Sequence, residues 1–203
     1  MPRVSEEHLE RRRRQILDAA RACFIRKGIY ETSMQDIFAE AGLSSGAVYR
    51  YFKSKNEIIE ANIANVIGDL KSFFADLAGS DPLLPVDEVV ERLASRVAAL
   101  SGEDGPLRLA PQAWALSLHD PEIAAYVADN VIGIRDTWTA YMRRLVDAGL
   151  LPADTDAVAA GKTLFSLVPG FLVQHLVVKD FSPAELRRGV KALTRDSMLT
   201  LLT

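Results

Sequence analysis

Cysteine, histidine and aromatic residues are scarce in this sequence. Its 203 residues include one cysteine, Cys23, and three histidines, and aromatic residues account for 7%. A lone thiol forms no disulfide within the chain, which favours a reducing compartment, and it excludes a zinc site built from several thiolates. No glycine-rich phosphate loop, nucleophile elbow or His-Glu-x-x-His motif occurs. We therefore expect no cofactor, no metal site and no enzymatic activity.

Long apolar runs are also missing. A membrane-spanning helix needs about eighteen or more consecutive apolar residues. The best run, residues 164–178, is shorter and contains Pro169, Gly170, Gln174 and His175. The first eight residues lack the apolar core of a signal peptide. Because apolar residues make up 49% and charged residues 25%, we expect an ordinary globular protein that is soluble and cytoplasmic.

The charge is unevenly distributed along the chain. The net charge of −3 argues weakly against nucleic-acid binding. Residues 1–60, however, contain 11 Lys/Arg and 9 Asp/Glu, whereas residues 61–203 contain 13 and 18. A slightly basic N-terminal segment on an acidic remainder suits a protein that docks on DNA with one end. Random variation of the surface charge is the alternative explanation.

Apolar residues recur with the helical period throughout, and no alternating run of β-branched residues indicates a strand. The predicted fold class is therefore all-α. Pro169-Gly170 lies inside one predicted helix and should kink or break it. About nine helices are expected, at about residues 5–27, 33–42, 44–52, 54–77, 86–100, a short one ending near 118, 121–148, 155–179 and 183–202.

The second and third predicted helices have the dimensions of a helix-turn-helix. Ser33 and Asp36 form a capping box at the start of the first, Gly42 ends it, and Ser44 caps the second. Such a unit places its second helix in the major groove of DNA. Val48 and Phe52, one turn apart, are expected to face inward. The residues left around the exposed side and the helix start are Ser45, Gly46, Ala47, Tyr49, Arg50 and Tyr51.

Cations and helix starts near this unit suggest phosphate contacts. Lys55 is expected at the first position of a helix, where the dipole disfavours a cation unless a phosphate is bound there. A solvated lysine without a role is the alternative. Thr32 and Ser33 lie at a second helix start. The basic run at residues 11–14 is available to the minor groove or backbone, or is a solvated helix face.

Residues 28–37 and 41–57 carry a specific resemblance. The segments Gly-Ile-Tyr-Glu-Thr-Ser-Met-Gln-Asp-Ile and Ala-Gly-Leu-Ser-Ser-Gly-Ala-Val-Tyr-Arg-Tyr-Phe-Lys-Ser-Lys, followed by Glu57, resemble the DNA-binding domain of the TetR family of transcriptional regulators. Phe38 departs from the more usual alanine. The resemblance implies operator contacts at several of these positions. With the residues above, the predicted DNA-binding set is Thr32, Ser33, Ser44, Ser45, Gly46, Ala47, Tyr49, Arg50, Tyr51 and Lys55.

Beyond about residue 60 the resemblance concerns architecture only. It implies a helix-turn-helix domain at residues 1–53 and a ligand-binding and dimerisation domain at 54–203, in which 54–78 form a connecting helix. The last two helices resemble the family's dimerising pair, and an isologous dimer suits an operator with two half-sites. Leu186 and Leu193, seven residues apart, are expected to share one face of the last helix.

Aromatic residues and a few polar ones on inward faces predict a ligand pocket with little fixed charge. Ordinary core packing is the alternative for each single residue. A small, largely hydrophobic or aromatic effector is therefore expected as a partner. The predicted ligand-binding residues are Phe73, Phe74, Trp114, Asn130, Trp138, Tyr141, Met142, Phe165, Phe171 and His175.

The sequence thus predicts a one-component transcriptional regulator. It is expected to be a repressor that binds double-stranded operator DNA as a homodimer and is released by its ligand. Release by ligand is implied by the resemblance alone. Two alternatives remain at this stage: a small-molecule-binding helical protein without a DNA function, and an enzyme hidden in the second domain.

Overall fold

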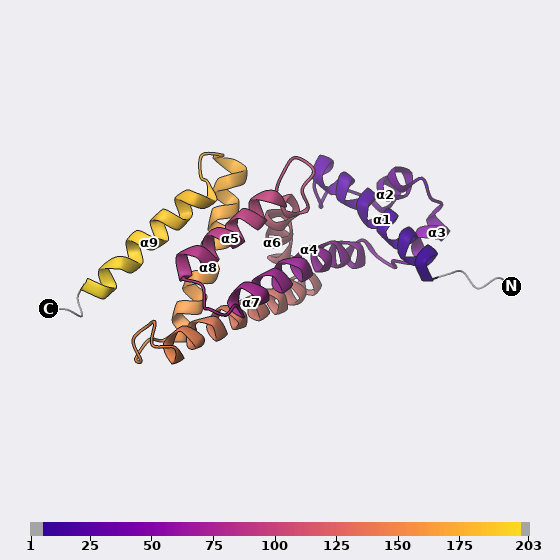
Figure 1. Cartoon of the computed structure of the whole chain (residues 1–203). Helices are drawn as coiled ribbons and strands as arrows, with labels where there is room; N and C mark the ends of the chain where they lie inside the picture. The colour runs from indigo at the N-terminus through magenta and orange to yellow at the C-terminus, as the bar shows by residue number, and fades with distance from the viewer. Residues whose placement is uncertain (1–5, 200–203) are drawn as a thin grey trace. The chain divides into compact units, whose positions relative to one another are not determined.

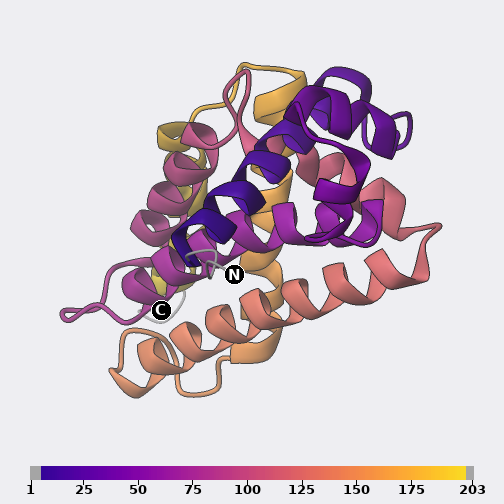
Figure 2. The ribbon, with the colours of Figure 1, turned by 90° about the vertical axis from the view of Figure 1, so that its right-hand side faces the viewer.

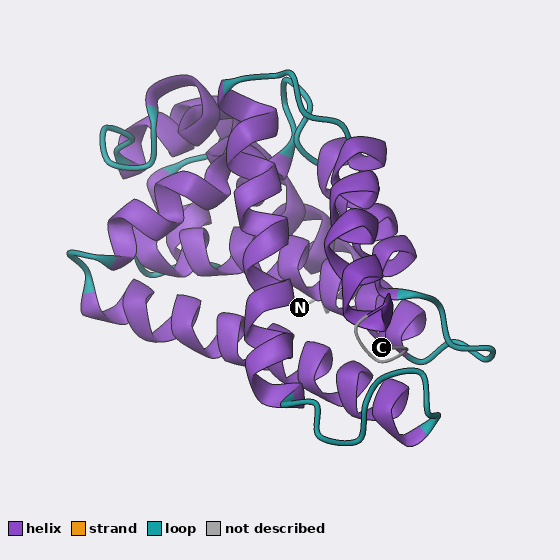
Figure 3. Cartoon of the chain, turned by 90° about the vertical axis from the view of Figure 1, so that its left-hand side faces the viewer, coloured by secondary structure: helices purple, strands orange, loops and turns teal. Residues whose placement is uncertain are grey.

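The chain forms helices, as predicted. The computed structural model describes the backbone of residues 6–199 and the side chains of residues 6–194, and this part contains no strand (Figures 1 and 3). The elements are α1 (Glu6–Lys27), α2 (Met34–Ala41), α3 (Ser45–Tyr49), α4 (Lys55–Ala78), α5 (Val86–Ala99), the 3-10 helix η1 (Pro106–Leu109), α6 (Ala110–Ser117), α7 (Pro121–Asp147), α8 (Ala157–Val177) and α9 (Pro183–Leu199).

Two details differ from the sequence prediction. Helix α3 ends at Tyr49 and not near Phe52. The Tyr51 amide bonds the Val48 carbonyl, three residues back, so the turn after Tyr49 is tighter than an α-helix. Of the predicted kink or break at Pro169-Gly170, the break is absent, because helix α8 continues through Pro169. Proline removes one helical hydrogen bond. Phe171 and Leu172, which follow Gly170, are buried and keep the helix packed beyond that point.

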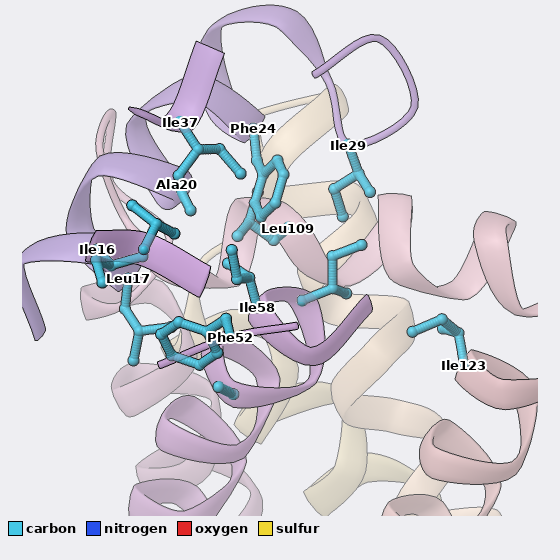
Figure 4. Close-up of a cluster of buried hydrophobic side chains, with 13 residues drawn as sticks. Ile16, Leu17, Ala20, Phe24, Ile29, Ile37, Phe52, Ile58, Leu109 and Ile123 are labelled. Atoms are coloured by element: carbon cyan, nitrogen blue, oxygen red, sulfur yellow. The ribbon is translucent and has the colours of Figure 1, made fainter. Parts of the chain in front are cut away.

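The chain packs as two units. The first takes the described residues up to Ile67 together with Pro106–Ala128, and the second takes Gly68–Gly105 with the residues from Asp129 onward. The first unit is built around one apolar core (Figure 4). Leu17, Phe24 and Ile37 come from α1 and α2, Ile58 from α4, and Leu109 and Ile123 from η1 and α7.

The division by packing does not follow the predicted boundary at residues 53/54. The helix-turn-helix helices alone leave the core open, and Leu109 and Ile123 complete it at 5% and 0% exposure. The segment 106–128, predicted to belong to the ligand-binding domain, therefore packs with the N-terminal helices. That residues 1–53 bind DNA and residues 54–203 bind the ligand and dimerise stays a prediction.

The second unit is held together around α5, which contacts both α8 and α9 (Figure 2). Val90, Leu93 and Val97 of α5 are buried. Arg187 of α9 bonds Asp87 at 2.9 Å and Glu91 at 2.7 Å, both on α5. Helices α7 and α8 approach closely at Gly161, where an added Cβ would lie 2.8 Å from the Thr139 hydroxyl. Only a glycine fits this crossing without a shift of backbone.

Candidate DNA-binding site

Helix α2 is fixed at both ends by local hydrogen bonds. The Asp36 amide donates to Ser33 Oγ at 3.2 Å, and the Ser33 amide donates to Asp36 Oδ2 at 2.9 Å, which is the predicted capping box. The bonds from Lys27 and Ser33 hold the pKa of the Asp36 carboxyl well below its usual range. Gly42 ends the helix with φ +63°, a left-handed conformation that disfavours side chains.

Helix α3 follows directly, with its inner residue in the core. Ser44 caps it by accepting from the Ala47 amide at 3.3 Å. Val48 is fully buried and Phe52 nearly so, as predicted, and both pack with Ile37 of α2. This packing holds the two helices as one rigid corner. The remaining residues of α3 are therefore turned away from the core.

The exposed side of α3 carries most of the residues predicted to contact DNA. Ser44, Ser45, Gly46, Tyr49 and Arg50 are exposed, and Ala47 is half-buried. A Cβ added to Gly46 would meet no atom within 4 Å, so the surface is open there. Small side chains at this position allow a groove floor to approach the backbone closely. Tyr51 differs from the rest because it is half-buried against the apolar core.

Phe38 has a consequence that the sequence reasoning missed. Its ring lies edge-on to Tyr49, with centroids 5.5 Å apart. Tyr49 is 42% exposed, so this contact restrains an otherwise free ring on the recognition surface. Phe38 therefore orients a predicted DNA-contacting residue and does more than fill the contact between helices.

Lys55 makes contacts that the sequence did not suggest. Its ammonium donates to the carbonyls of Ile29, Tyr30 and Thr32 at 3.1, 3.2 and 2.9 Å. An ammonium has three donors, and all three are used here. In this arrangement no donor of Lys55 is left for a phosphate. The side chain instead joins the start of α4 to the loop between α1 and α2.

Thr32 also plays a structural part. Its side chain is 1% exposed, and its hydroxyl donates to the Gly28 carbonyl at 2.7 Å. The position of this side chain therefore does not support its predicted contact with the DNA backbone. Ser33, the next residue, is exposed and leaves the start of α2 accessible.

Arginines of the basic run on α1 have different surroundings. The Arg13 guanidinium lies over the Phe52 ring, 5.3 Å from its centroid, and Arg12 donates to Gln15 at 2.8 Å. Arg11 and Arg14 are exposed. The run is thus partly used in packing, and its two outer members stay available to solvent or to DNA.

Two family models match the chain. The model described as "Bacterial regulatory proteins, tetR family" covers residues 16–61, and that described as "BetI-type transcriptional repressor, C-terminal" covers residues 103–198. The first contains the whole α2–α3 corner. The chain belongs to the TetR family. The resemblance noted from residues 28–57 is thereby confirmed.

Curated relatives match over parts of their length. The uncharacterized HTH-type regulator YfiR of Bacillus subtilis is 46% identical over 57 residues, which are 28% of each chain. The HTH-type transcriptional regulator BetI of Yersinia pestis is 28% identical over 132 residues, 61% of this chain and 62% of BetI. This chain therefore spans between about three tenths and three fifths of the length of these relatives.

Solved structures share the fold over nearly the whole chain. GusR of Salmonella enterica has a TM-score of 0.75 at 23% identity, over 96% of this chain and 100% of that one. A transcriptional regulator from Saccharomonospora viridis in complex with choline has a TM-score of 0.71 at 22% identity, over 92% and 96%. At these identities the likeness concerns the all-helical TetR fold.

In the second unit of this TetR-family chain, three of the predicted ligand-binding residues form a chain of ring contacts. Phe74 and Trp138 lie 4.4 Å apart between ring centroids, and Trp138 and Tyr141 lie 6.0 Å apart. All three are at most 2% exposed, and the Tyr141 hydroxyl donates to the Leu84 carbonyl at 2.6 Å. Burial raises the pKa of Tyr141. A ligand between these rings would have to separate them.

A second aromatic group includes two more of these residues. Phe171 stacks on His175 at 5.3 Å and lies 5.6 Å from Phe181, which the sequence reasoning did not single out. Met142 is buried, whereas Phe73 and Phe165 are half-buried. Trp114 belongs to the first unit, so the structure does not bring it into either group.

Polar groups in the second unit include the predicted Asn130 and two residues that the sequence gave no reason to choose, Lys71 and Arg135. Lys71 donates to the Asn130 side-chain oxygen at 3.0 Å. The Nε atom of Arg135 is buried without a hydrogen-bond partner. A cavity of about 310 Å³ lies where α7 ends and α8 begins, and none of the predicted ligand-binding residues lines it. Its lining includes Arg143, Asp147, Thr155 and Asp156.

Proposed function

We propose that this protein is a transcriptional repressor that binds operator DNA as a homodimer and releases it when a small molecule binds to the second unit. The observation that carries the proposal is the rigid α2–α3 corner with an open outer face at Ser45, Gly46 and Tyr49. An α-helix presented in this way fits the major groove. Since operator DNA lies in the cytoplasm, we place the protein there.

The face of α8 that stays exposed supports a dimer. Small and apolar side chains follow one another along it at helical spacing: Ala159, Thr163, Ser166, Gly170, Val173 and Val177. By length and composition α8 is apolar enough to cross a membrane, yet only 17% of its most apolar window is buried in the chain. A second copy of α8 would cover this stripe, since small residues allow two helices to pack closely. A dimer also supplies the two heads that two operator half-sites require.

Helix α9 divides its predicted interface residues between two environments. Leu186 is 7% exposed and Val190 6%, because both pack inside the chain on the side that faces α5. Leu193 is 80% exposed. The expectation that Leu186 and Leu193 share one interface face is therefore wrong for Leu186. A charge at Leu186 would damage the fold of the monomer, whereas a charge at Leu193 tests the interface.

The effector we propose is a small, largely hydrophobic molecule that carries one polar end. Phe74, Trp138 and Tyr141 would present aromatic faces to a ligand that separates them, and such faces also attract quaternary ammonium groups. Choline, with which the Saccharomonospora viridis regulator was solved, carries a quaternary ammonium group. The unpartnered Nε of Arg135 would be satisfied by a hydrogen-bond acceptor on the ligand.

A mobility-shift assay tests the DNA function. Duplexes from the region upstream of the chain's own gene, and duplexes from genomic selection, are titrated with wild-type protein and with Tyr49→Ala. We expect a specific shift that Tyr49→Ala weakens by about 1–3 kcal/mol, the scale of a lost groove contact. A wild-type protein that binds none of these duplexes would favour the alternative of a ligand-binding protein without a DNA function.

The ligand is sought by tryptophan quenching with choline, fatty acids and neutral aromatic compounds as separate arms. A ligand that acts as an inducer must bind the free protein more tightly than the DNA complex. Each compound that quenches is therefore added to the protein–DNA complex, where it should reverse the mobility shift. Binding by highly charged compounds alone would contradict the aromatic site.

A further inference from the structure

The loop between α1 and α2 is held by side chains from two other elements of the first unit. Lys55 of α4 binds three of its carbonyls, as described above. Gln112 of α6 accepts a hydrogen bond from the Ile29 amide at 2.7 Å through Oε1. Its Nε2 atom donates to the carbonyl of Phe24, in the last turn of α1, at 3.4 Å. One glutamine thus closes the end of α1 and fixes the first residue beyond Gly28.

The position of Gln112 in the sequence makes this contact unusual. It lies 83 residues after Ile29. The BetI-type C-terminal model begins at residue 103, so α6 belongs by sequence to the C-terminal part. By packing, however, α6 and η1 belong to the unit that contains α1, α2 and α3. Segment 106–128 is therefore the place where the C-terminal part of the sequence reaches the DNA-reading helices.

The loop in turn determines where α2 begins. Thr32, whose carbonyl Lys55 holds, is followed immediately by Ser33, the N-cap of α2. Helix α2 packs rigidly on α3 through Ile37 and Val48. A shift of α6 that moves the Ile29 amide would displace the start of α2 and, with it, the outer face of α3. Gly28, at φ +90°, gives the chain its turn at this point.

We infer that Gln112 is the positioning residue through which α6 sets the α1–α2 loop, and thereby the recognition helix, when the protein changes between its DNA-binding and released states. This inference rests on the proposed function. Because coupling between two sites is reciprocal, operator binding must also change the surroundings of α6. Trp114, two residues from Gln112 on the same helix, is a spectroscopic reporter already in place.

The experiment follows both tryptophans by 19F NMR in protein that contains 5-fluorotryptophan, with the Trp114 resonance assigned from Trp114→Phe. The probe is the operator duplex obtained by genomic selection. Wild-type protein should show a shift of the Trp114 resonance on binding. Gln112→Leu should lose this shift while its operator affinity falls only about two- to tenfold, because it loses the short hydrogen bond from the Ile29 amide and the longer one to the Phe24 carbonyl. Gln112→Glu, which still accepts from the Ile29 amide, should keep the shift.

Gln15→Leu is the matched control. Gln15 is a half-buried glutamine that donates to the Ala41 carbonyl at 2.8 Å, so it ties α1 to the end of α2 without involving α6. Its loss should weaken operator binding to a similar extent but leave the Trp114 response intact. Without DNA, hydrogen exchange of the Ile29 amide should be faster in Gln112→Leu than in wild type or Gln15→Leu.

Three results would decide against the inference. If the duplex binds and Trp114 does not respond, or if Gln112→Leu responds like wild type, Gln112 carries no coupling. If the Ile29 amide exchanges at the wild-type rate in Gln112→Leu, the hydrogen bond itself is refuted. If no selected duplex binds the wild-type protein, the proposed function fails, and the inference fails with it.

Discussion

Replacing Lys55 by methionine distinguishes a phosphate ligand from a structural tie. The substitution keeps the apolar stem and removes the ammonium that binds the carbonyls of Ile29, Tyr30 and Thr32. Hydrogen bonds to a charged group contribute about 1.5–3 kcal/mol. Tyr30 is 83% exposed, so its freed carbonyl becomes hydrated, but Ile29 and Thr32 are only 3% and 1% exposed, so the cost should not fall below the lower limit. For a chain of this size, about 1.5 kcal/mol corresponds to a melting temperature lower by about 3–6 °C.

The salt dependence of operator binding gives the second measurement. Each phosphate contact adds about 0.9 to the slope of log K against log salt concentration. If Lys55 only positions the loop, Lys55→Met should weaken binding, by up to about tenfold for a comparable loss of free energy, and leave the slope unchanged. Arg50→Met, which removes an exposed cation at the end of α3, should lower the slope by about 0.9.

The opposite pattern would refute this reasoning. A slope lowered by about 0.9 in Lys55→Met, together with a wild-type melting temperature, would show that the ammonium leaves the loop and binds a phosphate, as the sequence first suggested.

Three further predictions concern stability, acidity and assembly. Glu60→Gln should raise the melting temperature at pH 7. Burial and the charges of Glu122, Glu57 and Asp120 raise the pKa of Glu60. Its ionised form, which dominates as the pH rises, therefore opposes folding. An unchanged or lower value contradicts this. Asp36→Asn should flatten the loss of stability below about pH 3.8. The lowered pKa of Asp36 contributes stability above that pH, and this stability is lost as the carboxylate is protonated. Urea unfolding at several pH values measures the loss, and a wild-type acid profile in Asp36→Asn counts against the prediction. Gly170→Arg, on the exposed face of α8, should yield a folded monomer by light scattering, whereas a dimer that persists would move the interface elsewhere.

The α2–α3 corner was predictable because its signals are local. Ser33, Asp36 and Gly42 act on backbone groups within four residues, so their roles can be read from spacing alone. The inward direction of Val48 follows from the same short-range periodicity. The caps alone predict the geometry of the two helices, and the TetR-like residues around them indicate the family.

The roles of Lys55, Thr32 and Gln112 were not predictable in this way. Each depends on contacts between elements that are distant in sequence, such as the 26 residues between Lys55 and Ile29. A lysine at a helix start appears the same in a sequence whether it meets a phosphate or a neighbouring loop. Gln112 gave no signal, because a single glutamine in an apolar helix has no periodic pattern and is one polar residue among many.

The aromatic residues illustrate a different limit. Phe74, Trp138 and Tyr141 were chosen because rings on inward faces suit both a pocket and a core, and in the structure they contact one another at almost no exposure. Truncating Trp138 to alanine would therefore cost about 3–5 kcal/mol of folding free energy before any ligand is considered. Trp138→Ala therefore cannot separate a loss of ligand response from a loss of folding. Trp138→Phe, which keeps a ring beside Phe74, is the variant that tests the ligand role.

The contacts of the first unit show how a short recognition helix can be placed by residues outside it. Helix α3 has only five residues, and it is held by its Ser44 cap, by the buried Val48 and by the contact of the Tyr49 ring with Phe38. Its position depends on that of α2, and the start of α2 depends in turn on the loop that Lys55 and Gln112 hold. Because those two side chains come from α4 and α6, the DNA-reading surface is set by helices that continue into, or belong by sequence to, the C-terminal part. Under the proposed function, an effector that alters this loop would change how the protein meets DNA.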